Sequence, residues 1–484
     1  MNDGGLGANS YQLSDFIKFF SPKVDNKGEA EKHQRVVKMD DHGMERRAMR
    51  IGKGNMTPGR ILFLLLAIPI ASSWATPLRA EEPPRPVGYY VDAALSGYPS
   101  LGSMRQRITV KRNEAIRAGA LDDPKGWVAI TNVPVRTGSF RDEDMTGKEI
   151  GFSQMIPYPG KREHAARIVE KEKEQAEFDL AEMRNMLRAD VKMAYAELST
   201  VRAQAEVVRQ VRAVLDQVVQ VSTDMFAVGK GRQPDVLRGQ VEFQKMREML
   251  LTLENREKVL SIRLNTIAAL PPSAPVPALD NLAELFPGYD AEDLRAIYKA
   301  ERPARQAVQA RIEKGKLGII HAEHEYKPDF EVSTSYMQRD AMPDGTKRPD
   351  MFSAMVSMTL PIWRKGKIEP GIRAMAAEKE MAVFDLETFD IESANAIGGA
   401  LSSLGNFGAV AKLYRTTLIP QAEQSVQSSL EAYQVGKIDF PMLMDSLMAV
   451  LNFRKEYKGM VGEMHATKAR LEAVVGRELD GGGR

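Results

Sequence analysis

The side chains that come nearest to a chemical site are His321, Glu323 and His324. Two histidines three residues apart on a helix can bring both imidazoles to one metal ion. The same residues also suit an ordinary polar segment ahead of a strand, and we favour that interpretation. The 26 methionines mostly occupy apolar helical positions, which indicates core filling rather than a row of soft-metal ligands. We therefore predict no metal site and no cofactor.

The sequence contains no recognisable catalytic pattern. It has no cysteine, which excludes disulfides, thiolate metal sites and a cysteine nucleophile. It also has no GxSxG, HExxH or phosphate-binding loop. Lys plus Arg (67) and Asp plus Glu (65) nearly cancel, so the charge does not indicate nucleic acid as a partner. We predict a passive protein that is not an enzyme.

An apolar run near the N-terminus, ILFLLLAIPIA at residues 61–71, indicates export. It is too short to span a bilayer, which needs roughly twenty residues. Basic residues precede it, and Ser73-Trp74-Ala75 offers a small-x-small cleavage site. We predict a signal peptide at residues 60–75, cleaved after Ala75 or, as a second choice, after Ala80. Residues 1–59 are predicted to be a disordered or misassigned extension.

The rest of the chain repeats itself. Pro99, Pro124 and Pro157 recur in the same order as Pro303, Pro328 and Pro361, and Val228-Gly229-Lys230 recurs as Val435-Gly436-Lys437. Such ordered self-similarity indicates a tandem duplication. We predict a first repeat at residues 85–270, a Pro-rich linker at 271–293, a second repeat at 294–476 and a tail at 477–484.

Each repeat contains the same succession of elements. A helix is followed by two segments of alternating apolar and polar residues, which predict strand pairs at residues 126–157 and 328–361. Two long helices then meet at the Val-Gly-Lys turn, which predicts helical hairpins at residues 161–270 and 366–476. No proline or glycine occurs from His164 to Phe226, enough for a helix of roughly 95 Å. The glycine-rich stretch 396–408 predicts a bend in the matching helix of the second repeat.

The four strands constrain the architecture. About eight strands are the fewest that close a useful barrel, and an open sheet in lipid would leave its edges unpaired. A membrane location therefore requires several chains, and three would give a 12-stranded barrel that continues into a helical barrel. Aromatic residues near the helix-side ends of the strands are predicted to form a membrane-interface girdle: Trp127, Tyr158, Tyr326 and Trp363. Ordinary edge aromatics of a soluble sheet are the alternative.

The segments DMTGKEIGFSQMIPYPGK, AEFDL, FAVGKGRQPDVLRGQ and YQVGKIDFPMLMDSL resemble the TolC family of outer-membrane efflux proteins, and most closely its heavy-metal branch. The resemblance covers about residues 85–476. It implies a homotrimeric duct with a β-barrel in the outer membrane, in contact with its lipid, and an α-helical barrel in the periplasm. It also implies two partners, a periplasmic adaptor and an inner-membrane pump of the resistance-nodulation-division (RND) type, and export of metal cations or small toxic compounds.

Two groups of residues carry the functional predictions. The turns of the helical hairpins are predicted to face the adaptor: Val228, Gly229, Lys230, Val435, Gly436 and Lys437. A purely structural role for these glycines, which permit a positive φ where the chain reverses, is the alternative. The joints between strands and long helices form the second group: Pro157, Tyr158, Pro159, Gly160, Lys161, Pro361, Trp363, Gly366 and Lys367.

Three other functions fit the same elements. An exported coiled-coil scaffold and a periplasmic adaptor also contain long helical hairpins, although an adaptor needs a β-rich domain beside one hairpin. An outer-membrane channel for type I protein secretion has the same architecture. The sequence does not identify the exported substrate, because a wide polar lumen is not selective.

Overall fold

A computed structural model describes residues 84–285 and 288–479. All of the described residues fall in one compact unit. The predicted signal peptide and the extension before it lie outside the described residues. Within residues 84–285 and 288–479, no helix combines the length and the apolar character needed to cross a membrane.

The first part of the unit runs from helix to sheet and back to helix. Helices α2 (Val87–Gly97) and α3 (Pro99–Gly119) lead into strands β1 (Lys125–Thr131) and β2 (Gly147–Ile156). Two helices follow, α4 (Lys161–Ala227) and α5 (Gln233–Ile267). Helix α4 has 67 residues, which corresponds to about 100 Å.

The second part follows the same order. Helices α6 (Ala291–Glu301) and α7 (Pro303–Glu323) and the short η1 (His324–Tyr326) precede strands β3 (Phe330–Gln338) and β4 (Met351–Met358). Next come the π-helix η2 (Arg364–Ile368) and helix α8 (Glu369–Leu413). The remaining elements are a second π-helix, η3 (Tyr414–Leu418), and helices α9 (Ile419–Gln434) and α10 (Phe440–Val475). The prediction of four strands among long helices is confirmed.

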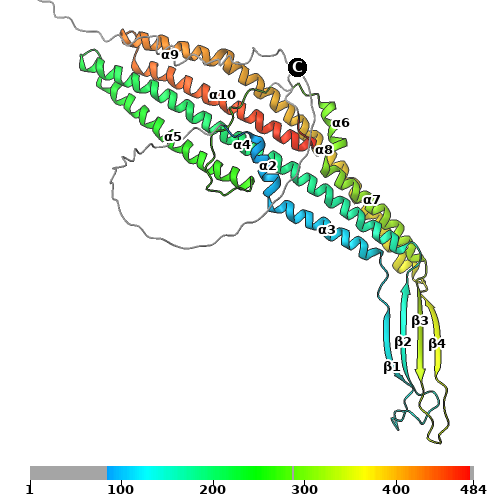
Figure 1. The fold of residues 1–484 in the computed structure, drawn as a ribbon. Coiled ribbons are helices and arrows are strands. Elements are labelled where there is room, and N and C mark those ends of the chain that lie inside the picture. Colours follow the sequence, from blue (N-terminus) through cyan, green and yellow to red (C-terminus); the bar gives the residue numbers. More distant parts are fainter. Residues whose placement is uncertain (1–83, 286–287, 480–484) are drawn as a thin grey trace, which may run out of the picture. The chain divides into compact units, whose positions relative to one another are not determined.

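Helix α4 is the central element of the helical part (Figure 1), and it contacts α3, α5, α7 and α10. Its apolar seam is buried along more than eight turns: Leu187, Val191, Ala194, Leu198, Val201, Ala205, Val208, Val211, Leu215 and Val218. Small residues alternate with larger ones in this seam, which lets neighbouring helices approach closely. Ion pairs tie α4 to its neighbours, for example Glu172 to Lys111 of α3 and Lys314 of α7, each at 2.8 Å.

Arg302, between α6 and α7, joins the two parts of the chain. Its guanidinium is 2.7 Å from the Glu182 carboxylate of α4 and also donates to the Ala473 carbonyl of α10. Asn185 of α4 donates to the same carbonyl at 2.7 Å. Because these groups are largely buried, each hydrogen bond satisfies a polar atom that would otherwise be costly to bury.

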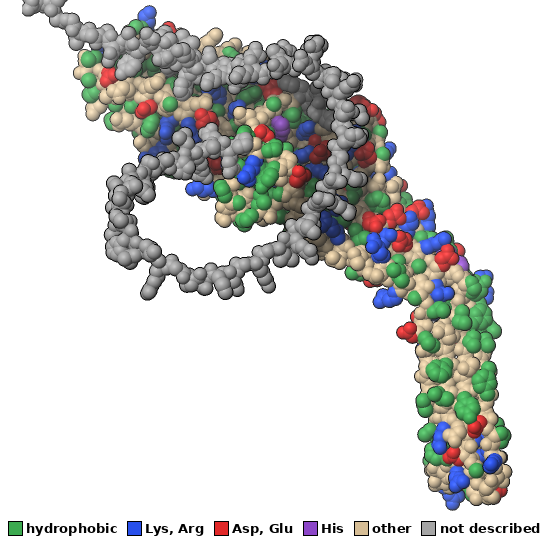
Figure 2. Space-filling model, viewed as in Figure 1, with side chains coloured by type: hydrophobic (Ala, Val, Ile, Leu, Met, Phe, Trp, Pro, Cys, Tyr) green, Lys and Arg blue, Asp and Glu red, His purple; other side chains and the backbone are tan. Residues whose placement is uncertain are grey.

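The four strands form one antiparallel sheet in the order β1-β2-β3-β4, so the two central strands come from different parts of the chain. Directly opposed residues share a face. One face carries exposed apolar side chains: Val128, Ile150, Phe152, Val332, Tyr336, Phe352 and Val356. The other face is more polar. It carries serines and two glutamates together with four methionines: Glu149, Ser153, Met155, Glu331, Ser333, Ser335, Met337, Met351, Ser353, Met355 and Ser357. Figure 2 shows hydrophobic side chains along the sheet, with charged ones gathered at its far loops.

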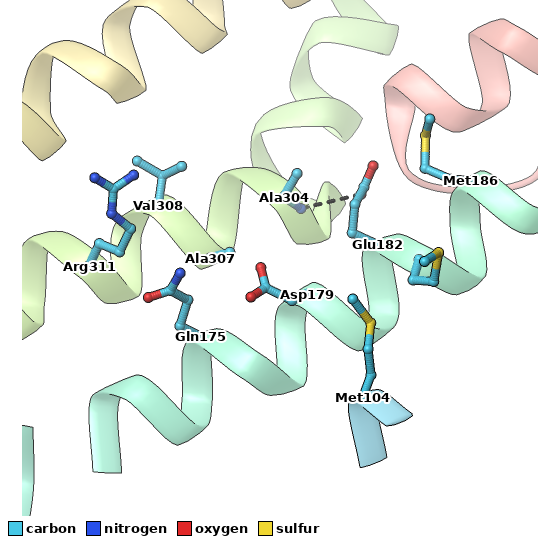
Figure 3. Close-up of a pocket in the computed structure, with 10 residues that line it drawn as sticks. Met104, Gln175, Asp179, Glu182, Met186, Ala304, Ala307, Val308 and Arg311 are labelled. Atoms are coloured by element: carbon cyan, nitrogen blue, oxygen red, sulfur yellow. Dashed lines mark hydrogen bonds between the residues drawn. The ribbon is translucent and has the colours of Figure 1, made fainter. Parts of the chain in front are cut away.

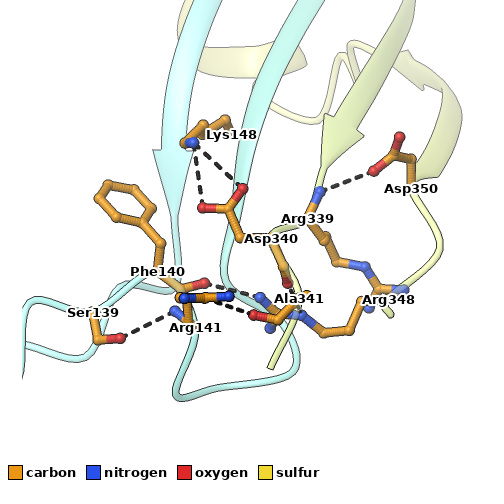
Figure 4. A network of polar contacts seen from close by, with 9 residues as sticks. All are labelled: Ser139, Phe140, Arg141, Lys148, Arg339, Asp340, Ala341, Arg348 and Asp350. Carbon is orange, nitrogen blue, oxygen red and sulfur yellow. Dashed lines mark hydrogen bonds and ion pairs between the residues drawn. The ribbon is translucent and has the colours of Figure 1, made fainter. Parts of the chain in front are cut away.

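Loops 132–146 and 339–350, at the far end of the sheet, are locked to each other by arginines (Figure 4). Arg348 is only 8% exposed and donates to the carbonyls of Phe140, Glu143 and Asp340. Arg141 reaches the Ala341 carbonyl in the opposite direction, at 3.0 Å. Since these bonds end on backbone carbonyls, they fix the path of both loops.

The glycine-rich stretch 396–408, where we expect a bend, does not interrupt the helix. Helix α8 continues through all of its glycines to Leu413, and the helical pattern changes only at η3. Both π-helices end two residues before a proline, Pro370 and Pro420. A proline ring has no N–H and clashes with the carbonyl one turn earlier, and a wider turn accommodates it.

Candidate functional site: strand-helix joints and helical tips

The first joint, residues 157–161, turns the chain from β2 into α4. The Tyr158 amide donates to Oδ1 of Asp329 at 2.8 Å, and the Lys161 amide donates to the Tyr158 carbonyl at 3.1 Å. Gly160 has φ of +95°, and a Cβ there would lie 3.3 Å from Nε2 of His324. Glycine is therefore required both by its backbone conformation and by the close approach of His324.

Asp329 is the hub of this region. Its carboxylate accepts from Tyr158 and lies 2.9 Å from Nζ of Lys161, whose side chain is 8% exposed. Its amide donates to the Thr359 hydroxyl at 2.8 Å, and its carbonyl accepts from the Thr359 amide at 2.9 Å. One residue thus connects the exit of β2, the entry of β3 and the exit of β4. Sequence reasoning missed Asp329, because a single Asp after a proline resembles an ordinary turn residue.

Histidines from both parts of the chain meet beside the first joint. The rings of His164 and His324 are 4.7 Å apart between centroids, and Nδ1 of His324 lies 2.9 Å from the Ile320 carbonyl. Nδ1 of His164 and Nδ1 of His321 are buried without a hydrogen-bond partner. Burial, and then the neighbouring His324, lower the pKa of His164. Among the described residues, no three His, Asp or Glu side chains are arranged to hold a metal ion.

The second joint, residues 361–368, is built differently. Trp363 has φ of −86° and ψ of 50°, and the chain then enters η2, with the Lys367 amide donating to the Trp363 carbonyl at 2.9 Å. Gly366 lies inside this π-helix with open space around it. Lys367 is exposed, whereas Lys161 of the first joint is buried.

The structure separates one of the four girdle aromatics from the others. Tyr158, Tyr326 and Trp363 lie beyond the helix-side ends of their strands. Trp127 instead pairs with Gly151 inside the sheet, on the face that carries the serines. Its indole covers Gly151 so closely that a Cβ there would lie 2.2 Å from the ring. Because side chains alternate between the two faces along β1, Trp127 lies on a face of the sheet and not at the end of the strand.

Two cations lie over these aromatics. The Arg364 guanidinium is 5.8 Å from the centroid of Tyr326, and Nζ of Lys327 is 6.0 Å from the centroid of Tyr158. Such pairs keep both partners near the surface and favour an environment that is partly apolar and partly wet.

The two tips of the helical hairpins have the same geometry. The Lys230 amide donates to the Met225 carbonyl and the Lys437 amide to the Ala432 carbonyl, each at 2.8 Å. Gly229 and Gly436 have φ of +75° and +74°. This is the Schellman ending, in which glycine at the left-handed position closes the helix. Val228 and Val435 are 68% and 67% exposed, so both tips present an apolar side chain to solvent.

The tips are held beside each other by buried side chains. Phe440 is fully buried, and its ring lies 5.6 Å from that of Tyr433 and against Gly239 of α5. The Tyr433 hydroxyl lies 3.1 Å from the Ser222 hydroxyl of α4. The two hairpins therefore form one packed end.

A cavity of about 400 Å³ lies between α3, α4 and α7 (Figure 3). Its lining is largely apolar and includes Met104, Met183 and Met186, with Asp179 at its centre. Burial raises the pKa of Asp179. No residue of this cavity was among the predicted site residues.

Comparisons with known proteins agree on one class. Residues 92–269 match the family model described as "Outer membrane efflux protein". The matched segment resembles outer membrane efflux proteins, and the chain shares the fold of solved outer membrane channels.

Individual proteins show the same resemblance. The cobalt-zinc-cadmium resistance protein CzcC of Cupriavidus metallidurans is 22% identical over 339 residues, which is 66% of this chain and 75% of CzcC. The outer membrane protein VceC of Vibrio cholerae has a TM-score of 0.68 at 18% identity, covering 81% of this chain and 96% of VceC. CusC has a TM-score of 0.65 at 12% identity, covering 81% and 92%.

Replacing the buried cation tests the hub at Asp329. We expect Lys161→Met to lower the free energy of unfolding by about 1–3 kcal/mol, because it leaves a partly buried carboxylate without its charge partner. Thermal unfolding of the solubilised chain measures the change. Lys316→Met removes an exposed ion pair with Glu313 and should cost at most about 0.5 kcal/mol. Equal effects of the two substitutions would refute the role of the hub.

The histidine contact predicts a pH dependence. Since the pKa of His164 is lower in the folded chain than its ordinary value of 6.5, the unfolded chain binds more protons between those two values. The contribution of neutral His164 to the free energy of unfolding is therefore complete above pH 6.5, and it is lost as the pH falls toward the pKa of His164 in the folded chain. We expect His164→Gln to flatten the dependence of the melting temperature on pH between roughly 8 and 5. An unchanged slope in this variant would contradict the prediction.

Proposed function

We propose that three copies of this chain form one continuous duct through the outer membrane and the periplasm. Their sheets close into a 12-stranded barrel, and their long helices form the periplasmic tube. The duct is passive and works with a periplasmic adaptor and an inner-membrane pump of the RND type. It exports metal cations or small toxic compounds.

The observation that carries this proposal is the sheet itself. One face is lined by exposed apolar side chains, and strands β1 and β4 each have a partner on one side only among the described residues. In lipid, each unpaired backbone group costs several kcal/mol. Pairing β1 of one copy with β4 of the next satisfies both edges, and twelve strands leave an open lumen where four cannot.

A tandem repeat accounts for the two similar parts of the chain. We propose that residues 85–270 and 294–476 are the two copies, joined by the linker at 271–293. Both copies contain a strand pair and a helical hairpin, and their tips share one hydrogen-bond pattern. Three chains then give six similar units around the axis of the duct.

Two observations support a substrate class: the side chains on the more polar face of the sheet, and the similarity to CzcC. The polar face of the sheet presents serine hydroxyls and the carboxylates of Glu149 and Glu331, which suit hydrated cations. The relative CzcC is named for resistance to cobalt, zinc and cadmium. We infer that metal cations are the principal cargo.

The helical tips are proposed as the adaptor-facing surface: Val228, Gly229, Lys230, Val435, Gly436 and Lys437. Their exposed valines and lysines support this role, because apolar side chains beside unpaired charges are common where a protein partner docks. The linker and both joints lie away from this end of the hairpins (Figure 1).

Changing both tip glycines tests the adaptor surface. We expect Gly229→Val combined with Gly436→Val to abolish metal efflux while the trimer remains in the outer membrane, because a β-branched residue strains each positive-φ turn by roughly 1–3 kcal/mol. Metal tolerance of cells and the trimer band from outer membranes measure the two effects. Gly102→Val in α3, where a side chain meets open space, is the control. Normal efflux in the double variant would contradict the proposal.

Engineered cysteines test the closure of the sheet, because the natural chain contains no cysteine. Ala129→Cys on β1 is combined in turn with Phe352→Cys, Ser353→Cys or Ala354→Cys on β4. We expect at least one combination to give a covalent trimer on oxidation. Ser153→Cys with Ser333→Cys, which face each other within one chain, should link no second chain. Denaturing gels that show no covalent trimer for any of the three combinations would refute the closure of the sheet between copies.

A further inference from the structure

The basic residues of the two joints differ in their partners: those of the first joint bind other groups of the protein, and those of the second are exposed. At the first joint, Nζ of Lys161 lies 2.9 Å from Asp329 and 3.4 Å from Glu325, and Arg162 donates to the Gly119 carbonyl at 3.1 Å. At the second joint, the basic residues are Arg364, Lys365 and Lys367, and all three are exposed. Among the described residues, none of these three has a carboxylate within ion-pair distance.

The carboxylates closest along the chain are already engaged. Glu325 pairs with Lys161, and Glu369, in the first turn of α8, lies 3.9 Å from Arg373. Lys327 adds a fourth exposed cation, because η1 contacts η2. The second joint therefore carries a local excess of positive charge that the protein itself does not neutralise.

Apolar side chains stand beside these cations. Leu360, Ile362 and Trp363 are 69%, 67% and 73% exposed. They follow β4 along the chain, and the apolar face of that strand also exposes Phe352 and Val356. Exposed apolar surface next to unpaired cations matches a molecule with an acyl chain and a phosphate.

We propose that residues 360–367, with Lys327, bind the headgroup of an anionic glycerophospholipid such as phosphatidylglycerol, in the membrane leaflet that faces the helices. The phosphate lies among Arg364, Lys365 and Lys367, whose charges neutralise it. The acyl chains follow Leu360 and Ile362 onto the apolar face of the sheet, and Trp363 lies at the level of the headgroups. The first joint takes no such lipid, since its cations are bound internally. The proposal rests on the placement of the sheet in the bilayer.

Binding of short-chain lipids to the detergent-solubilised full chain tests the site. We expect phosphatidylglycerol to bind about tenfold or more tightly than phosphatidylcholine with the same acyl chains, because each cation near an anionic surface favours binding about fivefold. The triple variant Arg364→Gln, Lys365→Gln and Lys367→Gln should lose this preference. The charge-conserving set Arg364→Lys, Lys365→Arg and Lys367→Arg should keep it.

A matched control separates a site from general attraction. Arg238→Gln, Arg247→Gln and Lys258→Gln remove the same charge from exposed positions of α5 and should leave the preference intact. Equal loss in this control, or no preference in the natural chain, would overturn the proposal. Displacement of the lipid by an equal concentration of inorganic phosphate would also overturn it, because free phosphate would then be the ligand.

Tryptophan fluorescence distinguishes failure of the site from failure of the proposed function. Lipids brominated in the acyl chain should quench Phe352→Trp in a Trp74→Phe, Trp127→Phe, Trp363→Phe background whenever the sheet lies in the bilayer. Quenching there without selectivity for phosphatidylglycerol would overturn only the headgroup site. No quenching would overturn the placement of the sheet and, with it, the duct.

Discussion

The constraint on which the structure depends is the pairing of backbone groups at the two edges of its sheet. Strands β1 and β4 each leave one row of N–H and C=O groups without a partner strand in the described chain. Water could satisfy these groups, but the apolar side chains on one face indicate lipid, which cannot. The topology of the sheet is consistent with this constraint. The central strands come from different parts of the chain, and among the described residues neither edge strand has a partner on its outer side.

The joints connect this sheet to long helices, of which α4 is about 100 Å long. Asp329 does so by connecting β2, β3 and β4 at one residue, through the Lys161 cation and the Thr359 backbone. The first joint turns sharply at Gly160, whereas the second enters α8 through a π-helix ahead of Pro370. This difference buries the cation of one joint and exposes those of the other. The first joint thus holds its lysine inside the protein, whereas the second presents a charged surface.

Much of the fold could be predicted from patterns with a clear physical period. The strands followed from strict alternation, and α4 followed from its apolar seam and from the lack of proline and glycine between His164 and Phe226. Contacts between distant parts of the chain could not be predicted in this way. The meeting of His164 with His324 and the hub at Asp329 depend on the pairing of β2 with β3, which no local pattern encodes.

Two predictions rested on local rules alone. Trp127 was predicted to lie at the membrane interface because it is close to the end of a strand. The alternation of side chains along β1 instead places it over Gly151, on the face that carries the serines. The glycines of 396–408 were expected to bend their helix. Helix α8 is continuous through them and packs against neighbouring helices, and the helical pattern changes only at η3, ahead of Pro420. The family resemblance was visible in ordered short segments, although no single one of them was decisive.

Single-channel recording from the purified chain in a planar bilayer tests the central claim most directly. If the edges of the sheet are closed by other copies, insertion produces discrete conductance steps of uniform size. Vesicle flotation in parallel shows that the protein has entered the lipid. Protein that enters the membrane and gives no conductance steps would contradict a duct formed by closure of the sheet.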